Sequence, residues 1–441
     1  MASRQSTPDW LQRILDDSSA PPKLYSWTSA NLSKERANQA VPKTQENSPK
    51  KPSRDRIHVL GIGNMGRLFA SSLAKLPSRP PITLVLHRKA LLEQWVSSPG
   101  IEITRSGEVQ KSTDFDVEWW TDEKPHSGPV IEATSGTGIT NLIVATKASD
   151  ALPLVDRLRR YLDDSSTVAF TQNGMCKMWP PVGDIYTGHR FSKDKGPNWI
   201  ACITTHGVVS LAPFRSRHAS VADVLVGPVS LNAQTGSSSN YLTDQIVNGP
   251  DLYGRKVSKS DLWVSQLKKL VVNSVINPLT ALLRCRNGDL FLSTDDEVAR
   301  VIDMLILEAS EVLKALIAHS SSAEILEITN VEHKYDPDSQ QTNATMDKLH
   351  DQFSFDNLRK MVYDVGHKVR ENTSSMLQDV RAGKPTEIRD FNGWLVETGE
   401  LLNEGLDLPS HKRLIGMVEN GLTLSREELG DRFGITDGQT P

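Results

Sequence analysis

Three polar side chains recur at four-residue intervals in an otherwise apolar stretch of the chain: Lys269, Asn273 and Asn277. Residues four apart lie on the same face of a helix, so a helix here aligns all three. The neighbouring residues are largely apolar and predict a buried helix, in which the pKa of a lysine falls. Ammonium and amide groups in an apolar wall suit an anionic, oxygen-rich ligand. The alternative interpretation is structural, with the amides bonding neighbouring helices and Lys269 reaching to water.

A proline follows this polar face directly, at position 278. Because proline has no backbone N–H, a helix that passes through Pro278 leaves a carbonyl of the preceding turn without its helical partner. We therefore expect free backbone acceptors near Asn273 and Asn277, beside the polar side chains.

A glycine-rich turn is the second set of residues with recognisable chemistry. It follows the apolar segment 57–60 and precedes apolar residues at helical spacing, and this order of strand, glycine turn and helix is typical of a dinucleotide site. The first glycine makes a tight turn, the second lets the backbone approach a pyrophosphate, and the third lets helix and strand pack closely. The predicted cofactor-binding residues of the turn are Gly61, Ile62, Gly63, Asn64, Met65 and Gly66.

The residues after the next predicted strand, Ile82–Leu86, indicate which dinucleotide binds. An NAD site usually has a carboxylate about 20 residues after the glycine motif, where it bonds the ribose 2′-hydroxyl. Here the sequence is His87-Arg88-Lys89 instead. A carboxylate would repel a 2′-phosphate, whereas an arginine can bind one with its planar fork of donors. We predict that Arg88 selects NADPH/NADP+; the alternative is a solvated basic turn.

Two more polar residues follow predicted parallel strands. Lys147 comes after the apolar segment 141–146, and Asn173 comes after the segment 167–171. Ligands of open α/β sheets bind at the carboxyl ends of the strands, so both residues are candidates to contact cofactor or substrate. Either one alone would more often be an ordinary loop residue.

These elements predict an α/β domain followed by an all-α domain, as a chain of 441 residues allows. We expect a disordered extension over residues 1–54 with one short amphipathic piece, a Rossmann NADP-binding domain over 55–257, and a helical domain over 258–441. Three segments of low apolar content look like surface insertions or boundaries: residues 182–198, 232–259 and 318–345.

Composition excludes several classes of function. The net charge of −4 offers no basic face for nucleic acid, and no apolar run is long enough to span a membrane. The three cysteines, Cys176, Cys202 and Cys285, have neither metal-site spacing nor an even number for disulfides. We expect no metal and a reducing compartment, the cytoplasm, with the mitochondrion as the alternative.

Taken together, the motifs resemble those of the ketopantoate reductase (2-dehydropantoate 2-reductase) family over residues 57–418. They are the glycine turn, Lys147, Asn173-Gly174, K-L-V-V-N-S-V-I-N-P-L-T at 269–280, Asn287-Gly288, S-S-M-L-Q-D at 374–379 and T-E-I at 386–388. The resemblance implies a Rossmann domain joined to a helical domain like that of 6-phosphogluconate dehydrogenase, with the active site in the cleft between them. The long N-terminal lead and the insertions are typical of a fungal-type member.

The resemblance also implies a role for each motif residue. Lys269 and Glu387 would be catalytic, with Lys269 the general acid for the ketone oxygen and Glu387 also meeting the cofactor and the substrate's terminal hydroxyl. Lys147 and Asn173 would line the cofactor. The substrate-binding set would be Asn173, Lys269, Asn273, Asn277, Asn287 and Ser375, with Ser375 holding the carboxylate.

The implied reaction is the NADPH-dependent reduction of 2-dehydropantoate to pantoate, on the route to pantothenate and coenzyme A. Two alternatives stay open: a reductase of the same fold acting on another branched 2-keto acid, and a non-catalytic NADPH-binding regulatory protein. The expected partner is a small 2-keto acid, and a homodimer is the candidate assembly.

Overall fold

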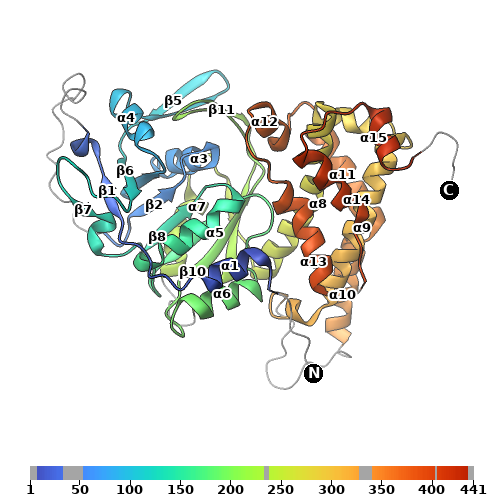
Figure 1. Ribbon diagram of the computed structural model, residues 1–441, viewed down its shortest axis with the longest axis horizontal. Helices are drawn as coiled ribbons and strands as arrows, with labels where there is room; N and C mark the ends of the chain where they lie inside the picture. Colours follow the sequence, from blue (N-terminus) through green and yellow to red (C-terminus); the bar gives the residue numbers. More distant parts are fainter. Residues whose placement is uncertain (1–6, 33–52, 233–237, 327–339, 403–404, 436–441) are drawn as a thin grey trace. The chain divides into compact units, whose positions relative to one another are not determined.

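The computed structural model describes residues 7–32, 53–232, 238–326, 340–402 and 405–435 (Figure 1). The chain divides into two compact units. The sheet unit comprises Asp9–Gln172 and Cys176–Leu262, and the helical unit comprises Met1–Pro8, Asn173–Met175 and Trp263–Pro441. The chain therefore passes from one unit to the other inside a helix, five residues beyond the expected boundary at 257/258. The turn that contains Asn173 belongs to the helical unit, although it directly follows a strand of the sheet unit.

A ten-stranded mixed sheet forms the centre of the sheet unit. Its six central strands, from β10 to β6, are parallel, while β13 and β1 run antiparallel to their inner neighbours. In spatial order the strands are β14 (Gly254–Lys256), β13 (Val224–Ser230), β10 (Asn198–Thr204), β9 (Thr167–Phe170), β8 (Asn141–Val144), β2 (Ile57–Leu60), β3 (Ile82–Leu86), β6 (Asp116–Thr121), β1 (Tyr25–Trp27) and β7 (Ile131–Glu132). The strands predicted at 57–60 and 82–86 are confirmed.

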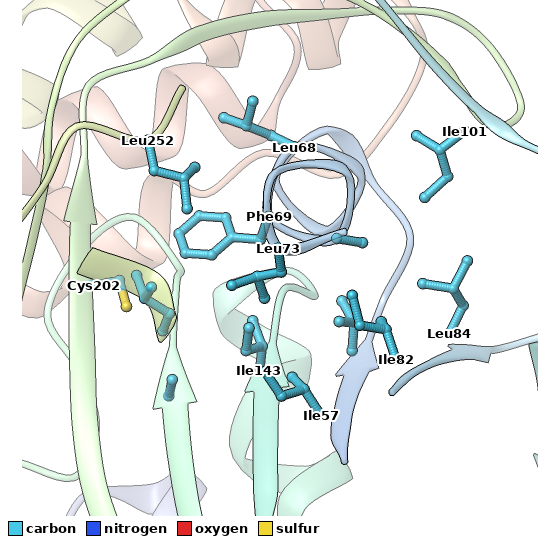
Figure 2. Packing of buried hydrophobic residues seen from close by; sticks show 14 of the residues in the cluster. Ile57, Leu68, Phe69, Leu73, Ile82, Leu84, Ile101, Ile143, Cys202 and Leu252 are labelled. Atoms are coloured by element: carbon cyan, nitrogen blue, oxygen red, sulfur yellow. The ribbon is translucent and has the colours of Figure 1, made fainter. Parts of the chain in front are cut away.

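Helix α3 (Asn64–Leu73) packs its apolar face on this sheet and so fixes the position of the glycine turn that precedes it. Phe69 and Leu73 are fully buried and point toward Ile57 and Ile143 of strands β2 and β8 (Figure 2). Strands β2, β3 and β8 are buried along their whole length, as expected for parallel strands covered on both faces, which explains why they read as continuous apolar runs in the sequence.

The remaining elements of the sheet unit include a second, four-stranded sheet. Its strands in spatial order are β11 (Gly207–Ala212), β12 (Arg215–Ser220), β4 (Ile101–Arg105) and β5 (Glu108–Ser112). The other elements are η2 (Ala133–Gly136), η3 (Arg159–Tyr161), α4 (Lys89–Ser97), α5 (Ala148–Arg157), α6 (Val182–Arg190) and α7 (Ser238–Asn248).

Segments 182–198 and 232–259 are not confined to the surface, although the boundary candidate 232–259 ends only three residues before the observed boundary between Leu262 and Trp263. Segment 182–198 contains α6, whose Tyr186 is fully buried. Segment 232–259 contains α7 and β14, and Leu242, Ile246 and Leu252 join the main hydrophobic core. A few apolar residues at the correct spacing suffice for burial here, so low average hydrophobicity was a misleading signal. In segment 318–345, residues 327–339 lie outside the described residues.

The expectation of disorder for residues 1–54 is also wrong where the structure describes them. Residues 7–32 contain α1 (Asp9–Asp16), β1 and η1 (Ser29–Asn31), and α1 lies along α6 (Figure 1). Leu11 is fully buried, and β1 pairs antiparallel with both β6 and β7. Strand β1 thus obtains its stability from partners about 100 residues away, which a local pattern does not reveal. Residues 1–6 and 33–52 lie outside the described part.

The helical unit is built around α8 (Lys259–Leu283), most of which belongs to it. Its other elements are η4 (Asn287–Phe291), α9 (Glu297–Ala318), η5 (Ser320–Ser322), α10 (Gln340–Gln352), α11 (Phe355–Lys368), α12 (Ser375–Arg381), a π-helical turn η6 (Arg389–Gly393), α13 (Trp394–Leu402), α14 (Pro409–Glu419) and α15 (Arg426–Arg432). Among all described helices, none is both long and apolar enough to cross a bilayer.

Candidate active site

The glycine turn has the backbone geometry of a pyrophosphate cradle. Gly61 has a φ of +93°, and a Cβ on Gly66 would lie 2.0 Å from the Gly61 carbonyl oxygen, so neither position accepts a side chain. Helix α3 begins at Asn64, and the first N–H groups of a helix have no helical acceptor. Residues 61–66 therefore fit a bound dinucleotide, whose phosphates such N–H groups and the helix dipole favour.

Several side chains of this turn point into the fold rather than toward a ligand. Asn64 donates through Nδ2 to the Val208 carbonyl at 3.0 Å and accepts through Oδ1 from Ser216 Oγ at 3.1 Å, so its side chain is bound to β11 and β12. Ile62 and Met65 pack against the hydrophobic core. Binding by these three residues would therefore come from their main-chain atoms, which refines the prediction from the motif.

Arg67 supports the turn, and the sequence reasoning missed it. Only 4% of this residue is exposed, and burial lowers its pKa to about 10. Its guanidinium donates to the carbonyls of Gly63 (3.2 Å), Ala212 (2.6 Å) and Arg215 (3.0 Å). It thus ties the turn to the β11–β12 hairpin. An arginine one residue after the motif carried no signal, because its acceptors lie about 145 residues away.

The two predicted basic contacts of the sheet unit both follow parallel strands. Arg88 is exposed and caps the N-terminus of α4, two residues after the end of β3. Lys147 is partly buried and caps α5, three residues after the end of β8. Both positions are at the carboxyl edge of the sheet, where ligands of α/β folds bind.

In the helical unit, the structure brings together Lys269, Asn173 and Glu387. Lys269 Nζ donates to Asn173 Oδ1 at 2.8 Å, and Asn173 Nδ2 lies 3.5 Å from Glu387 Oε2. Burial lowers the pKa of Lys269 to about 8, while the negative charge of Glu387 acts in the opposite direction. Glu387 itself is 7% exposed. The group thus contains an ammonium that is easily deprotonated, a carboxylate that stabilises its charge, and an amide oriented by both.

The turn that carries Asn173 is held in place by residues of α8 and η6. Gln266, one turn before Lys269 on α8, donates through Nε2 to the Gly174 carbonyl at 3.0 Å. Gly174 has a φ of +78°, and a Cβ there would lie 2.7 Å from the Asp390 carbonyl oxygen. Position 174 therefore requires a glycine, because a side chain there would collide with the backbone of η6, which follows Glu387 in the chain.

A second polar pair lies further along the same face of α8. Asn277 is buried, and its Nδ2 lies 3.5 Å from Ser375 Oγ at the start of α12. Next to this pair, the hydroxyls of Thr280 and Ser374 share a hydrogen bond of 2.7 Å. Asn273 stands on α8 between Lys269 and Asn277 and is partly buried. The face predicted from four-residue spacing is thus extended by a hydroxyl from α12.

The carbonyl left free by Pro278 has a specific partner. Pro278 lies inside α8 and cannot donate to the Ser274 carbonyl four residues earlier. Asn392, which is fully buried in η6, donates to that carbonyl at 2.9 Å. Its Nδ2 also lies 2.9 Å from His411 Nδ1, while His411 Nε2 bonds the Leu305 carbonyl at 3.0 Å. Burial lowers the pKa of His411 to about 4, so the ring is neutral and can accept at Nδ1.

This network joins α8, which carries Lys269, to the turn that follows Glu387. The proline indicated that a donor was needed, but no feature of the sequence identified Asn392 as that donor. Asn287, predicted on the substrate side, lies at η4, where its backbone N–H donates to the Asn372 carbonyl at 3.1 Å.

Comparison with known proteins identifies the family of the chain. The family model described as ketopantoate reductase PanE/ApbA matches residues 57–230, and its C-terminal counterpart matches residues 261–421. A ketoisovalerate reductase of Gibberella fujikuroi is 40% identical over 450 residues, covering 98% of this chain and 99% of the relative. A ketoisovalerate reductase of Beauveria bassiana is 40% identical over 459 residues, covering 97% and 98%.

A solved structure shares the fold at low sequence identity. The ternary structure of D-mandelate dehydrogenase with NADH and anilino(oxo)acetate has a TM-score of 0.56 and 15% identity, covering 85% of this chain and 99% of that chain. The two-part match to the family models corresponds to the sheet unit and the helical unit.

Proposed function

Because the chain belongs to the ketopantoate reductase family, we propose that it reduces a branched 2-keto acid with NADPH, and that this acid is ketoisovalerate. The family's enzymes are NAD(P)-dependent reductases, and the glycine turn fits that cofactor. The observation that carries the proposal is the contact of Lys269, Asn173 and Glu387. Two relatives named ketoisovalerate reductase, each 40% identical over nearly the whole chain, support the choice of substrate.

The cofactor, when bound, supplies the hydride that reduces the keto carbon. Residues 61–66 would hold its phosphates through main-chain N–H groups, and Arg88 would bind the 2′-phosphate. The remaining chemistry belongs to the chain's own side chains, and it consists of delivering one proton to the keto oxygen and holding the acid in position.

Lys269 would donate that proton. The keto oxygen gains negative charge as the keto carbon is reduced, and an ammonium aimed at it both stabilises the charge and supplies the proton. With a pKa of about 8, Lys269 is mostly protonated at neutral pH but gives up its proton more readily than an exposed lysine. Asn173 accepts one Lys269 N–H and so orients the ammonium. The neutral amine then regains a proton from solvent.

The carboxylate of the substrate would be bound further along α8. Asn277 and Ser375 place an amide and a hydroxyl side by side, and both can donate to a carboxylate oxygen. Asn273 lies one helical turn from Lys269 and would meet the substrate between the two ends. Because the ketone and carboxylate carbons of a 2-keto acid are directly bonded, the side chains of Lys269 and Asn277 would have to converge on the substrate from positions two helical turns apart.

Ketopantoate is the second candidate substrate, and the buried carboxylate of Glu387 favours it. A buried carboxylate can accept a hydrogen bond from the terminal hydroxyl that ketopantoate carries and ketoisovalerate lacks. A site built to bond such a hydroxyl discriminates strongly against analogues without it. Glu387 would then bind the terminal hydroxyl of the substrate as well as stabilise the charge of Lys269.

The test is NADPH oxidation by the purified protein with ketoisovalerate, ketopantoate and a straight-chain 2-keto acid. We expect the highest kcat/KM with ketoisovalerate. A value at least about ten-fold higher with ketopantoate would assign the second candidate, since that ratio corresponds to one good hydrogen bond. NADPH binding without turnover of any 2-keto acid would contradict both candidates and identify a non-catalytic binding protein.

A further inference from the structure

The N-terminal segment 25–32 borders the part of the sheet where we expect the cofactor's ribose to bind. Leu86, the last residue of β3, is paired with Trp119 of β6, and Trp119 is paired with Trp27 of β1. Trp27 therefore stands level with the carboxyl end of β3, two strands away. The residues that follow Leu86 are His87, Arg88 and Lys89, which form the predicted 2′-phosphate site.

Trp27 is held rigidly in this position. It is 4% exposed, its Nε1 donates to the Glu123 carbonyl at 2.9 Å, and its ring lies 5.1 Å from that of Trp119. The chain after it is fixed by Asn31, whose Nδ2 donates to the carbonyls of Ser127 and Pro129 at 2.8 Å. The turn η1 packs against α4, the helix that Arg88 caps. Segment 25–32 is therefore held in a defined position beside α4 and the carboxyl end of β3.

Lys89 contacts this segment through the Trp27 ring. Its Nζ lies 5.6 Å from the centroid of the Trp27 ring, within the range of a cation–π interaction. Lys89 is otherwise exposed, as the first residue of α4, and an exposed lysine samples many rotamers. The contact with Trp27 restricts the ammonium to the carboxyl edge of the sheet, one residue from Arg88.

We propose that Trp27 is a positioning residue for cofactor selection, holding Lys89 as a second cation beside Arg88 for the 2′-phosphate of NADPH. This inference rests on the proposed use of NADPH. The 2′-phosphate is a dianion, and a guanidinium fork together with an ammonium neutralises it more completely than either cation alone. The family model matches from residue 57, so Trp27 would add a contribution from outside the part of the chain that the model describes.

The experiment measures binding of two cofactor fragments by calorimetry, without any reaction. One fragment, 2′,5′-ADP, carries the 2′-phosphate, and the other, 5′-AMP, lacks it. The wild type should bind 2′,5′-ADP more tightly. Trp27→Leu should raise its Kd by roughly three- to ten-fold, the size of a cation–π contact, and leave the Kd of 5′-AMP unchanged. Lys89→Met should have a similar effect, and the double variant should add little to either single change because both remove one interaction.

Two controls separate positioning from general support of the fold. Trp27→Phe keeps a ring face and should restore most of the preference for 2′,5′-ADP. Trp120→Leu removes a buried aromatic residue of the same neighbouring strand whose ring packs on His58 instead, so it should lower the melting temperature but keep the ratio of the two Kd values. Lys89→Met changes an exposed side chain and keeps the test valid even if Trp27→Leu does not fold.

Three outcomes would overturn the inference. Equal weakening of both fragments by Trp27→Leu would show that Trp27 only supports the fold. An unchanged ratio in Lys89→Met, with the wild type still preferring 2′,5′-ADP, would exclude Lys89 and leave the use of NADPH intact. A wild type that does not discriminate between the fragments would contradict the NADPH preference itself, and this inference with it.

Discussion

The cofactor turn and the Lys269 group represent two opposite ways of building a site. The turn is six consecutive residues that would bind the cofactor through backbone atoms, since Asn64 turns its side chain into the fold. The Lys269 group consists of side chains that are 96 and 214 residues apart along the chain. Binding by backbone atoms is therefore disrupted by substitutions that add atoms, whereas a site made of side chains is disrupted by substitutions that remove or displace those side chains.

The largest expected effect is the loss of Lys269. Lys269→Ala removes the proton donor and should lower kcat roughly 10²- to 10⁴-fold, the usual contribution of general acid–base catalysis. The Kd for NADPH, measured by fluorescence titration, should stay within about three-fold, because the glycine turn lies in the other unit of the chain. If the variant lost NADPH affinity to the same extent as kcat, cofactor binding and proton donation could not be assigned to separate groups of residues.

Adding one carbon to the cofactor turn should have the next largest effect. In Gly66→Ala, the new Cβ would lie 2.0 Å from the Gly61 carbonyl oxygen, so the turn must shift. We expect the KM for NADPH to rise by roughly ten-fold or more, with a much smaller change of kcat at saturating cofactor. An unchanged KM would mean that the turn does not hold the phosphates.

The buried network behind the Lys269 group should contribute mainly to stability. Asn392→Leu leaves the Ser274 carbonyl and His411 Nδ1 without a donor and should lower the free energy of unfolding by about 1–3 kcal/mol. In a Pro278→Ala background, the alanine that replaces the proline has a backbone N–H for the Ser274 carbonyl, so the same change should cost about 1 kcal/mol less. Urea titration of the four proteins measures this coupling, and purely additive costs would show that Asn392 does not compensate for the proline.

The smallest effect is expected for Asn64. Its side chain bonds Val208 and Ser216, so Asn64→Ala should lower the melting temperature slightly and change the KM for NADPH by less than about three-fold. Steady-state kinetics with varied NADPH provide the check. A rise of KM as large as that of Gly66→Ala would place the Asn64 side chain in contact with the cofactor and contradict the backbone interpretation.

The same comparison explains what could be predicted from the sequence. Strands Ile57–Leu60 and Ile82–Leu86 were predictable because a buried parallel strand is a continuous apolar run between turn residues. The face of Lys269, Asn273 and Asn277 was predictable because helical spacing is a local property. Each of these signals is contained within about a dozen residues.

The remaining features depend on residues that are distant in the chain. Strand β1 could not be predicted because its three residues gain their hydrogen bonds from β6 and β7. The buried donors Arg67 and Asn392 could not be assigned because their acceptors lie about 145 and 118 residues away. The burial of segment 232–259 could not be predicted because a few scattered apolar residues, among them Leu242, Ile246 and Leu252, bring it into the core.

The central claim, that Lys269 donates the proton, is tested most directly by the pH dependence of kcat/KM for the keto acid in wild type and Lys269→Arg. Burial lowers the pKa of Lys269 from 10.5 to about 8, and the reaction needs the protonated form. Wild-type kcat/KM should therefore be level below pH 8 and fall about ten-fold per pH unit above it.

Arginine keeps the positive charge but does not release its proton in proteins. Lys269→Arg should bind NADPH normally, retain well under about a tenth of the wild-type rate, and lack the decline above pH 8. Near-full activity of Lys269→Arg with an unchanged pH profile would contradict the claim and make Lys269 a binding cation only.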